Sequence, residues 1–194
     1  MAKSRTPMHK LTRKLALLAG AVLFAASSAQ AGNQGPLGIG RPPTAQELAR
    51  YAAFSVRPDG RGLPAGRGTA IEGKGVYAAK CASCHGPTGK EGGMTGNRVT
   101  PALVDRRPFK VGSTNATVGN YWQYSTTIWD YTHRAMPFDR PGTLSNDAIY
   151  AVTAYLLYAN GLIGERDVVD AYSLPKVRMP NRDAFVPDPR PDVP

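Results

Sequence analysis

The chain has 194 residues, with 24 Lys and Arg against 14 Asp and Glu, and a formal net charge of +10 at pH 7. This length suits one domain, or one domain with extensions. The basic residues are scattered along the chain and form no stripe with aromatic residues, which argues against a nucleic-acid-binding protein.

Residues 1–31 are predicted to be a secretory signal peptide. The first 14 residues carry five basic side chains and no acidic ones, and residues 15–26 form an uncharged apolar stretch. That stretch is too short for a membrane anchor, because spanning a bilayer takes about 20 apolar residues. Ala29-Gln30-Ala31 has the pattern of a cleavage site, so we expect a periplasmic protein that begins at Gly32 and has no membrane anchor.

Residues 32–68 are rich in Gly, Pro and Arg and are predicted to be an N-terminal extension that lies on the main domain. Thr44 and Glu47 have the spacing of a capping box, which predicts a short helix through about Ala53. A turn is predicted at residues 57–60, with the sequence RPDG.

The main domain is predicted to be all-α and to span residues 69–163. A second capping box at residues 69–72 opens a helix that runs into Cys81. Gly73 and Tyr77 lie four residues apart on one face of this helix. A small residue followed by an aromatic one at this spacing permits a close crossing with another helix.

Residues 81–85, CASCH, have the C-x-x-C-H pattern of a c-type haem attachment site. Residues three and four apart on a helix share a face, so Cys81, Cys84 and His85 should point the same way. One face can then provide two thioether bonds to the haem vinyl groups and an imidazole for the iron. The motif predicts one covalently attached haem c with His85 as an axial ligand, and it leaves no cysteine for a disulfide.

Two other kinds of site share part of this pattern. A thioredoxin-like C-x-x-C pair sits at a strand-to-helix turn, and no βαβ unit is predicted here. A structural zinc site draws four ligands from paired Cys and His clusters. The chain has no second C-x-x-C, and its only other histidine beyond the first nine residues is His133. Haem attachment is therefore the favoured interpretation.

Residues 86–120 are rich in glycine and are predicted to be a long loop. Long loops are uncommon in small domains unless they have a function, and a haem edge would give this one something to wrap. A ligating histidine usually donates its second ring N–H to a carbonyl or carboxylate. The region around Pro101 is the candidate source of that acceptor for His85.

Apolar and aromatic side chains recur at helical spacing in residues 121–135, which predicts a helix there. The helix should end at Ala135, because Met136 precedes Pro137 and a residue before proline avoids the α region. Ile128, Tyr131, Thr132 and Ala135 share one face of this helix.

The last main helix is predicted at about residues 146–160, with Ser145 as its N-cap and Gly161 as its C′ residue. Residues 164–194 are predicted to be a Pro-rich C-terminal tail, with few core-forming residues after Ser173. The apolar stripe of the helix is Ile149, Val152, Tyr155, Leu156 and Ala159.

Met136 is the favoured second axial ligand of the haem iron. It stands at the end of the predicted helix, where Pro137 fixes the backbone and would aim the thioether. A lone methionine is more often core filler, and the predicted mature chain also contains Met94 and Met179. His133 is the rival ligand; it would give a bis-histidine haem of lower potential, and we expect it to face solvent.

Assembled in order, the helix, C-x-x-C-H motif, loop, Met-Pro and closing helix resemble a class I monohaem cytochrome c. The resemblance implies that fold, with three to five helices around one covalently bound haem. It also implies that the first helix, at Gly73 and Tyr77, crosses the last helix at Val152 and Tyr155. The implied haem-binding residues are Cys81, Cys84, His85 and Met136.

A narrower resemblance covers most of residues 37–190. Residues 121–163 are similar to the cytochrome domain of the SoxD type, and so are the stretches FSVRPDGRGLPAGRGTAIEGKGVYAAKCASCHG and LPKVRMPNRDAF. Cytochromes of this type accept electrons from periplasmic molybdenum sulfite or sulfane dehydrogenases. Some of them carry two haem domains, whereas this chain has one motif, so a free carrier and a permanent subunit both stay open.

These observations predict a periplasmic c-type cytochrome that transfers single electrons in sulfur-compound oxidation, from a molybdopterin dehydrogenase to a downstream cytochrome or oxidase. We expect no catalytic site of its own, and Asp130 with His133 is interpreted as a surface pair. The alternatives are a general respiratory carrier for another dehydrogenase, a structural subunit, and a haem enzyme or sensor with a displaceable sixth ligand. Met136 argues against the haem enzyme or sensor, because an iron with His and Met ligands is six-coordinate and has no free position.

Overall fold

A computed structural model describes residues 40–53, 55–95, 98–187 and 189. It divides into two compact units, Met1–Arg50 and Tyr51–Pro194. The predicted signal peptide lies outside the described residues. Within the part of the chain that is described, no helix is long and apolar enough to cross a membrane.

Helix α2 (Ala45–Ala53) begins in the first unit at the predicted capping box. The Thr44 N–H donates to Glu47 Oε2 at 2.8 Å, and the Glu47 N–H donates to Thr44 Oγ1 at 3.2 Å. Arg41 pairs with the same carboxylate at 2.6 Å. This guanidinium, followed by the Thr44 bonds, lowers the pKa of Glu47 to about 2. The helix spans the residues predicted for it.

The second unit is built around two helices, α3 (Ala70–Lys80) and α6 (Asn146–Ala159). Both start at the predicted N-caps: Thr69 forms the full capping box, and the Ser145 hydroxyl accepts from the backbone of the first turn. Gly161 follows α6 with φ of +78°, a left-handed conformation that favours glycine. The local signals in the sequence therefore placed both helices correctly.

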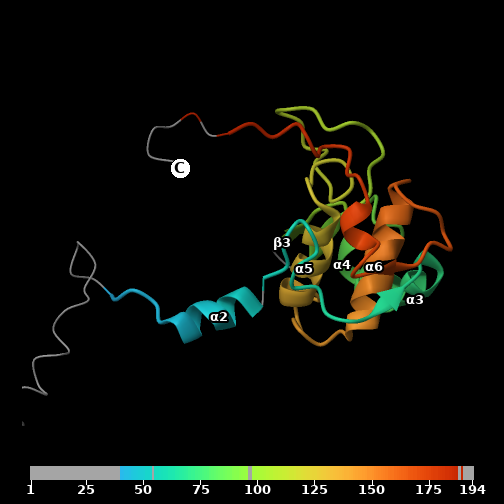
Figure 1. The fold of residues 1–194 in the computed structure, drawn as a ribbon. Helices are drawn as coiled ribbons and strands as arrows, with labels where there is room; N and C mark the ends of the chain where they lie inside the picture. The colour runs from blue at the N-terminus through green and yellow to red at the C-terminus, as the bar shows by residue number, and fades with distance from the viewer. Residues whose placement is uncertain (1–39, 54, 96–97, 188, 190–194) are drawn as a thin grey trace, which may run out of the picture. The chain divides into compact units, whose positions relative to one another are not determined.

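Helices α3 and α6 cross in close contact (Figure 1). A Cβ atom added to Gly73 would lie 1.8 Å from the backbone oxygen of Ala151, so only glycine permits this approach. One turn further along, the rings of Tyr77 and Tyr155 lie with their centroids 4.9 Å apart. The predicted crossing is confirmed, with Ala151 as the point of closest approach and its neighbour Val152 buried in the core.

Helix α5 (Ser125–Ala135) packs against α6 and ends at the predicted residue. It begins at Ser125, four residues after the start of the segment 121–135 in which the helix was predicted. The residues before it form a separate turn, in which the Thr117 N–H donates to Asn120 Oδ1 at 2.8 Å and the Asn120 N–H donates to Thr117 Oγ1 at 3.3 Å. The Tyr121 N–H closes this turn on the Thr117 carbonyl at 3.0 Å, and the backbone of Tyr124 is extended, with φ of −130° and ψ of 135°, so the helix begins only at Ser125.

The face of α5 that carries Ile128, Tyr131, Thr132 and Ala135 is buried only at Ile128 and Thr132. The Tyr131 side chain is 49% exposed and packs edge-on against the ring of Trp122, at 5.5 Å between centroids. Trp129 instead turns into the core, 1% exposed, against Tyr150 of α6. The buried residues of α5 are Ser125, Thr126, Ile128, Trp129 and Thr132.

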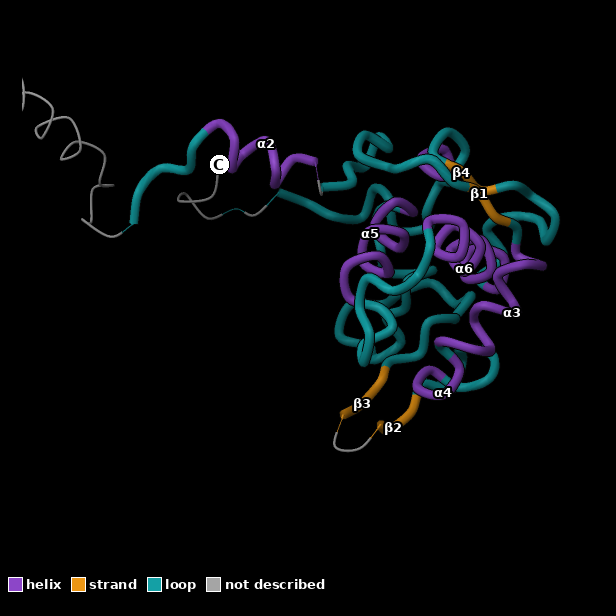
Figure 2. Tube along the Cα trace, turned by 90° about the horizontal axis from the view of Figure 1, so that it is seen from below, coloured by secondary structure: helices purple, strands orange, loops and turns teal. Residues whose placement is uncertain are grey.

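The segment before α3 and the segment after α6 meet in a short antiparallel pair. Strand β1 (Arg67–Gly68) pairs with β4 (Val169–Asp170), and both lie beside α6 (Figure 2). The Arg67 N–H also donates to the Asp147 carboxylate in the first turn of α6, at 2.8 Å. This small sheet, which the sequence did not predict, fastens the end of the N-terminal extension to the domain.

The first part of the C-terminal tail belongs to the core. A 3-10 helix, η1 (Leu174–Lys176), packs on α5, and the Ser125 hydroxyl donates to the Leu174 carbonyl at 2.6 Å. Leu174 is fully buried and Met179 is 1% exposed. Few residues after Ser173 are buried, as expected, and these two belong to the hydrophobic core cluster that also contains side chains of α5 and α6.

Candidate haem site

The C-x-x-C-H residues span the end of α3 and the short helix that follows it. Cys81 closes α3 and precedes the short helix α4 (Ala82–His85). The backbone N–H groups of Cys84 and His85 both donate to the Cys81 carbonyl, at 3.1 and 3.0 Å. This i+3 and i+4 bonding is the helical geometry expected to place the three side chains on one face.

Both cysteines are free and half-buried. Burial, with a smaller contribution from Cys84, raises the pKa of the Cys81 thiol to about 11. The described residues also contain no group of three or more His, Cys, Asp or Glu that could hold a metal ion.

The imidazole of His85 is held from one side. His85 is 9% exposed, and its Nδ1 lies 2.9 Å from the carbonyl oxygen of Pro101. A carbonyl can only accept, so Nδ1 carries the proton and Nε2 is left with its lone pair. The predicted acceptor region is confirmed. A histidine oriented in this way by a carbonyl has the geometry of an iron ligand with its supporting hydrogen bond.

A second hydrogen bond lies beside this one, and the sequence analysis missed it. The Thr100 hydroxyl donates to the Cys84 carbonyl at 2.5 Å. Thr100 ends strand β3 (Arg98–Thr100), which pairs with β2 (Gly93–Thr95) in a hairpin next to α4 (Figure 2). Thr100 and Pro101, at the end of the hairpin, thus form hydrogen bonds with Cys84 and His85 of the motif.

Replacing Thr100 with valine should lower the free energy of unfolding by about 1 kcal/mol, because the Cys84 carbonyl loses its donor while side-chain shape is kept. Thr100→Ser keeps the hydroxyl and should cost much less. Chemical denaturation of both variants measures the difference. Equal stability of the valine variant and the unchanged protein would contradict the role of this bond.

The start of the long loop is fixed to α3 and to itself. The Tyr77 hydroxyl donates to the Gly86 carbonyl at 2.9 Å, and burial raises the pKa of this tyrosine. The backbone N–H groups of Leu103 and Val104 both donate to the Gly89 carbonyl, at 2.7 and 2.9 Å. Gly89 has φ of +78°, which explains a glycine at this point. These bonds bring Pro101 back to the motif.

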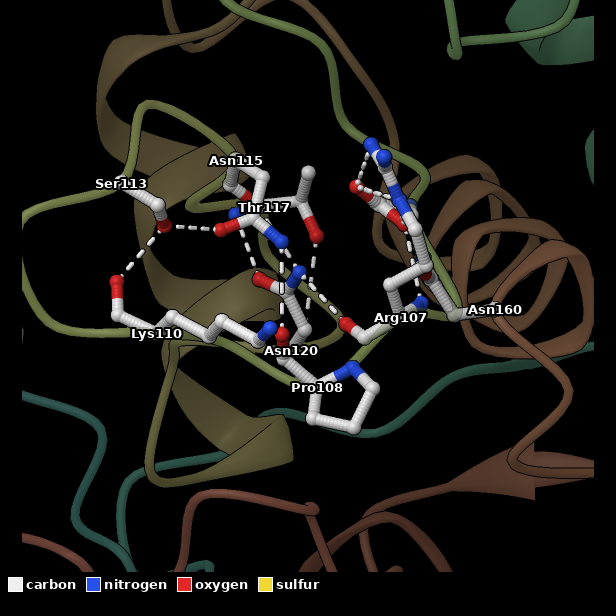
Figure 3. Close-up of polar contacts among 9 residues, drawn as sticks. Arg107, Pro108, Lys110, Ser113, Asn115, Thr117, Asn120 and Asn160 are labelled. Atoms are coloured by element: carbon white, nitrogen blue, oxygen red, sulfur yellow. Dashed lines mark hydrogen bonds and ion pairs between the residues drawn. The ribbon is translucent and has the colours of Figure 1, made fainter.

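Two asparagines stabilise the rest of the loop (Figure 3). Buried Asn120 donates to the carbonyls of Arg107 and Asn115, at 3.0 and 2.9 Å. Asn160, at the end of α6, accepts from the Asp105 N–H at 3.1 Å and donates to the Leu103 carbonyl at 3.2 Å. Residues 101–120 are therefore ordered by protein contacts, in addition to any contact with a haem.

Met136 occupies the C-cap of α5, half-buried and with extended backbone angles. Its N–H donates to the Thr132 carbonyl at 3.1 Å, which closes the last turn of the helix. The predicted helix exit is thus present. Of the other methionines, Met179 is a core residue, and Met94 lies in β2, where its side chain is outside the described part of the structure.

His133 does not face solvent as predicted. Its ring stacks on Trp129 with centroids 5.0 Å apart, and its Nδ1 is buried without a hydrogen-bond partner among the described residues. Nor does it pair with Asp130, whose carboxylate instead forms an ion pair with Arg134 at 2.6 Å. Both expectations were wrong because the aromatic ring prefers the flat face of Trp129, while arginine satisfies the carboxylate in a bidentate manner.

The residues present fit a covalently attached haem. Two free thiols and a histidine share one helical turn, and the histidine already has its supporting acceptor. Met136, at the C-cap of α5, would offer a soft thioether. This donor set, two sulfurs for attachment plus nitrogen and sulfur for iron, is the chemistry that haem c requires.

Comparison with known proteins agrees with this fit. A family model described as cytochrome C oxidase, cbb3-type, subunit III, matches residues 68–156. A chain of the sulfane dehydrogenase SoxCD from Paracoccus pantotrophus has 38% sequence identity and a TM-score of 0.65, over 80% of this chain and 74% of that one. Among curated protein sequences, none matches. The chain therefore belongs to the cytochrome c family, with a class I fold and covalently bound haem c.

Proposed function

We propose that this cytochrome accepts single electrons in the periplasm from a molybdenum sulfite or sulfane dehydrogenase and passes them to a downstream cytochrome or oxidase. Cys81 and Cys84 attach the haem, and His85 and Met136 are its axial ligands. The haem, when bound, supplies one-electron chemistry at its iron. The chain's own residues orient that group, restrict access of water to it and present it to partners.

The proposal of a sulfur-oxidising partner rests on the extent of the likeness to SoxCD. That likeness covers 80% of the chain, whereas the general cytochrome model covers only residues 68–156. It therefore includes segments outside the haem domain. The likeness beyond the haem domain is what favours a dehydrogenase partner over a general carrier.

Single-electron transfer is favoured over catalysis at the iron by the two proposed ligands. His85 is fixed by the Pro101 carbonyl, and Met136 is fixed by the end of α5. An iron with both ligands has no free position for a substrate. The Met thioether also favours the reduced state, which suits an acceptor of electrons from a dehydrogenase.

Rapid mixing with a sulfite-reduced molybdenum dehydrogenase tests the partner. Haem reduction should be much faster than for an unrelated class I cytochrome c of similar net charge, and the rate should saturate as the complex fills. Equal rates for the two cytochromes would remove the sulfur assignment and leave electron transfer in place. Co-elution with the dehydrogenase on size exclusion separates a permanent subunit from a free carrier.

A further inference from the structure

The C-terminal tail is fastened to the segment that leads into α5. Residues 174–185, here called the strap, begin with η1 and continue past the core residue Met179. The contacts of the strap with this segment fall on residues 121–125. In Figure 1 the orange-red strap can be followed to the yellow segment before α5. The strap and the start of α5 are therefore packed together, although they are far apart in the sequence.

Two side-chain amides join the strap to this segment in a reciprocal way. Asn181 of the strap donates from Nδ2 to the Tyr121 carbonyl at 2.7 Å. Gln123 donates from Nε2 to the Arg182 carbonyl at 3.0 Å. Both bonds are partly buried, so removing either donor leaves a carbonyl that water compensates only in part. Each segment thus supplies one donor and one acceptor to the other.

Side-chain rings strengthen the same attachment. The Arg182 guanidinium lies over the Tyr124 ring, 4.4 Å from its centroid. The Tyr121 ring makes edge contacts with Phe185 of the strap and with Phe109, at 5.6 and 4.8 Å between centroids. Both the backbone and the side chains of the segment before α5 are therefore held by the strap.

Helix α5 lacks the side-chain cap that fixes the start of the other two long helices of this unit. Its N-cap residue, Tyr124, makes no side-chain cap bond, whereas α3 and α6 are capped by Thr69 and Ser145. The hydroxyl of Ser125, the first residue of α5, donates instead to the Leu174 carbonyl of the strap at 2.6 Å. Because a cap normally fixes the first turn of a helix, the strap takes over this task for α5.

The other end of α5 carries Met136 as its C-cap. The 11 residues of the helix move as a unit, since backbone hydrogen bonds join its successive turns. Near the middle of the helix, Trp129 is buried against Tyr150 of α6. A shift of the start of α5 about this fixed point would swing its C-terminal end the opposite way and displace the Met136 thioether.

We propose that the strap holds the Met136 thioether on the haem iron by fixing the start of α5, with Asn181 and Gln123 as positioning residues. When the strap is loosened, α5 tilts, the sulfur leaves the iron more often, and the sixth position opens to added ligands. One neutral donor then replaces another, and the iron stays ferric. This inference rests on the proposed ligation by Met136 and is independent of which protein donates the electron.

Imidazole binding to the ferric holoprotein measures how often the sixth position is open, because apparent affinity scales with the fraction of the competent state. Asn181→Ala should raise the apparent imidazole affinity about fivefold, the factor that one net hydrogen bond contributes to an equilibrium. An absorbance titration measures this affinity. A value equal to that of the unchanged protein would overturn the proposal.

Asn146→Ala is the matched control. Its amide donates to the Ala65 carbonyl at 3.1 Å, so the same kind of bond is lost, but this bond fastens the segment before α3 to the first turn of α6. The variant should lose some stability and keep the imidazole affinity within about twofold. An equal rise in both variants would show that any loosening of the fold opens the iron, which would also overturn the role of the strap.

Gln123→Met removes the reciprocal donor at similar side-chain length, and it decides the question if Asn181→Ala fails to fold. It should raise the affinity in the same direction, and an unchanged affinity would count against the proposal as decisively.

Met136→Ala separates this inference from the ligation on which it rests. If this variant binds imidazole tightly while both strap variants bind it like the unchanged protein, the role of the strap fails alone. If Met136→Ala binds imidazole no better than the unchanged protein, ligation by Met136 fails, and the role of the strap fails with it.

Discussion

Gly73→Ala should destabilise the protein by about 3 kcal/mol, at the upper end of the usual cost of overpacking. The added methyl group would meet the Ala151 carbonyl oxygen at 1.8 Å and the Tyr155 Cβ at 2.9 Å. The first obstacle is backbone, which cannot rotate away as a flexible side chain can. Helices α3 and α6 must therefore move apart, and Tyr77 and Tyr155 lose their packing.

Gly75→Ala, two residues along the same helix, is the control. A Cβ atom at Gly75 would have nothing within 4 Å. Alanine should stabilise the helix there by roughly 0.5–1 kcal/mol, because glycine loses more backbone entropy on folding. Chemical denaturation of the two holoproteins measures both changes: the free energy of unfolding should fall for Gly73→Ala and rise for Gly75→Ala. A Gly73 variant as stable as the Gly75 variant would show that the helices can separate without cost.

The features that the sequence predicted well are those set by local chemistry. Thr69 and Ser145 identify helix starts because their hydroxyls can reach N–H groups only a few residues away. Pro137 fixes the end of α5 by restricting the residue before it. The C-x-x-C-H spacing works in the same way, since one helical turn decides which face its side chains share.

The errors arose where a distant residue decides the outcome. Tyr131 has the right spacing for the core, but Trp122 offers an aromatic edge at the surface. His133 stacks on Trp129, which itself is held by Tyr150 of another helix. Met179 stands in a Pro-rich segment that looks extended, yet the core formed by α5 and α6 leaves space for it. The i, i+4 spacing of Trp129 and His133 permits their stack, but periodicity within α5 contains no information on Tyr150, on Trp122 or on the packing of Met179.

In the candidate site, too, the features set by local chemistry could be predicted, and the contacts between separate segments could not. The acceptor for His85 could be placed near Pro101 because a ligating histidine needs one. The Thr100 bond to Cys84 and the asparagines that order the loop could not, because they depend on how the hairpin and the end of α6 fold back on the motif. Their only signal in the sequence is a polar residue next to Pro101 and an asparagine at a helix end.

Met136→Ala should change the haem and leave the fold nearly intact. Loss of the thioether removes what favours the reduced state, so the reduction potential should fall, and the iron should bind added ligands such as cyanide or carbon monoxide. Met179→Ala should lower the stability of the fold and leave the haem unchanged. It removes a side chain that is 1% exposed, which should cost about 2–5 kcal/mol in stability without altering the spectrum or the potential.

His133 is the rival that this comparison must exclude. Its buried Nδ1 has no partner among the described residues, which is the condition of a nitrogen that could bind iron. Yet this atom has almost no exposed surface, and to reach an iron the ring would have to leave its stack on Trp129. His133→Ala should therefore keep the Met136 spectrum. If His133→Ala opened the iron to added ligands while Met136→Ala did not, His133 would be the ligand and Met136 a half-buried packing residue.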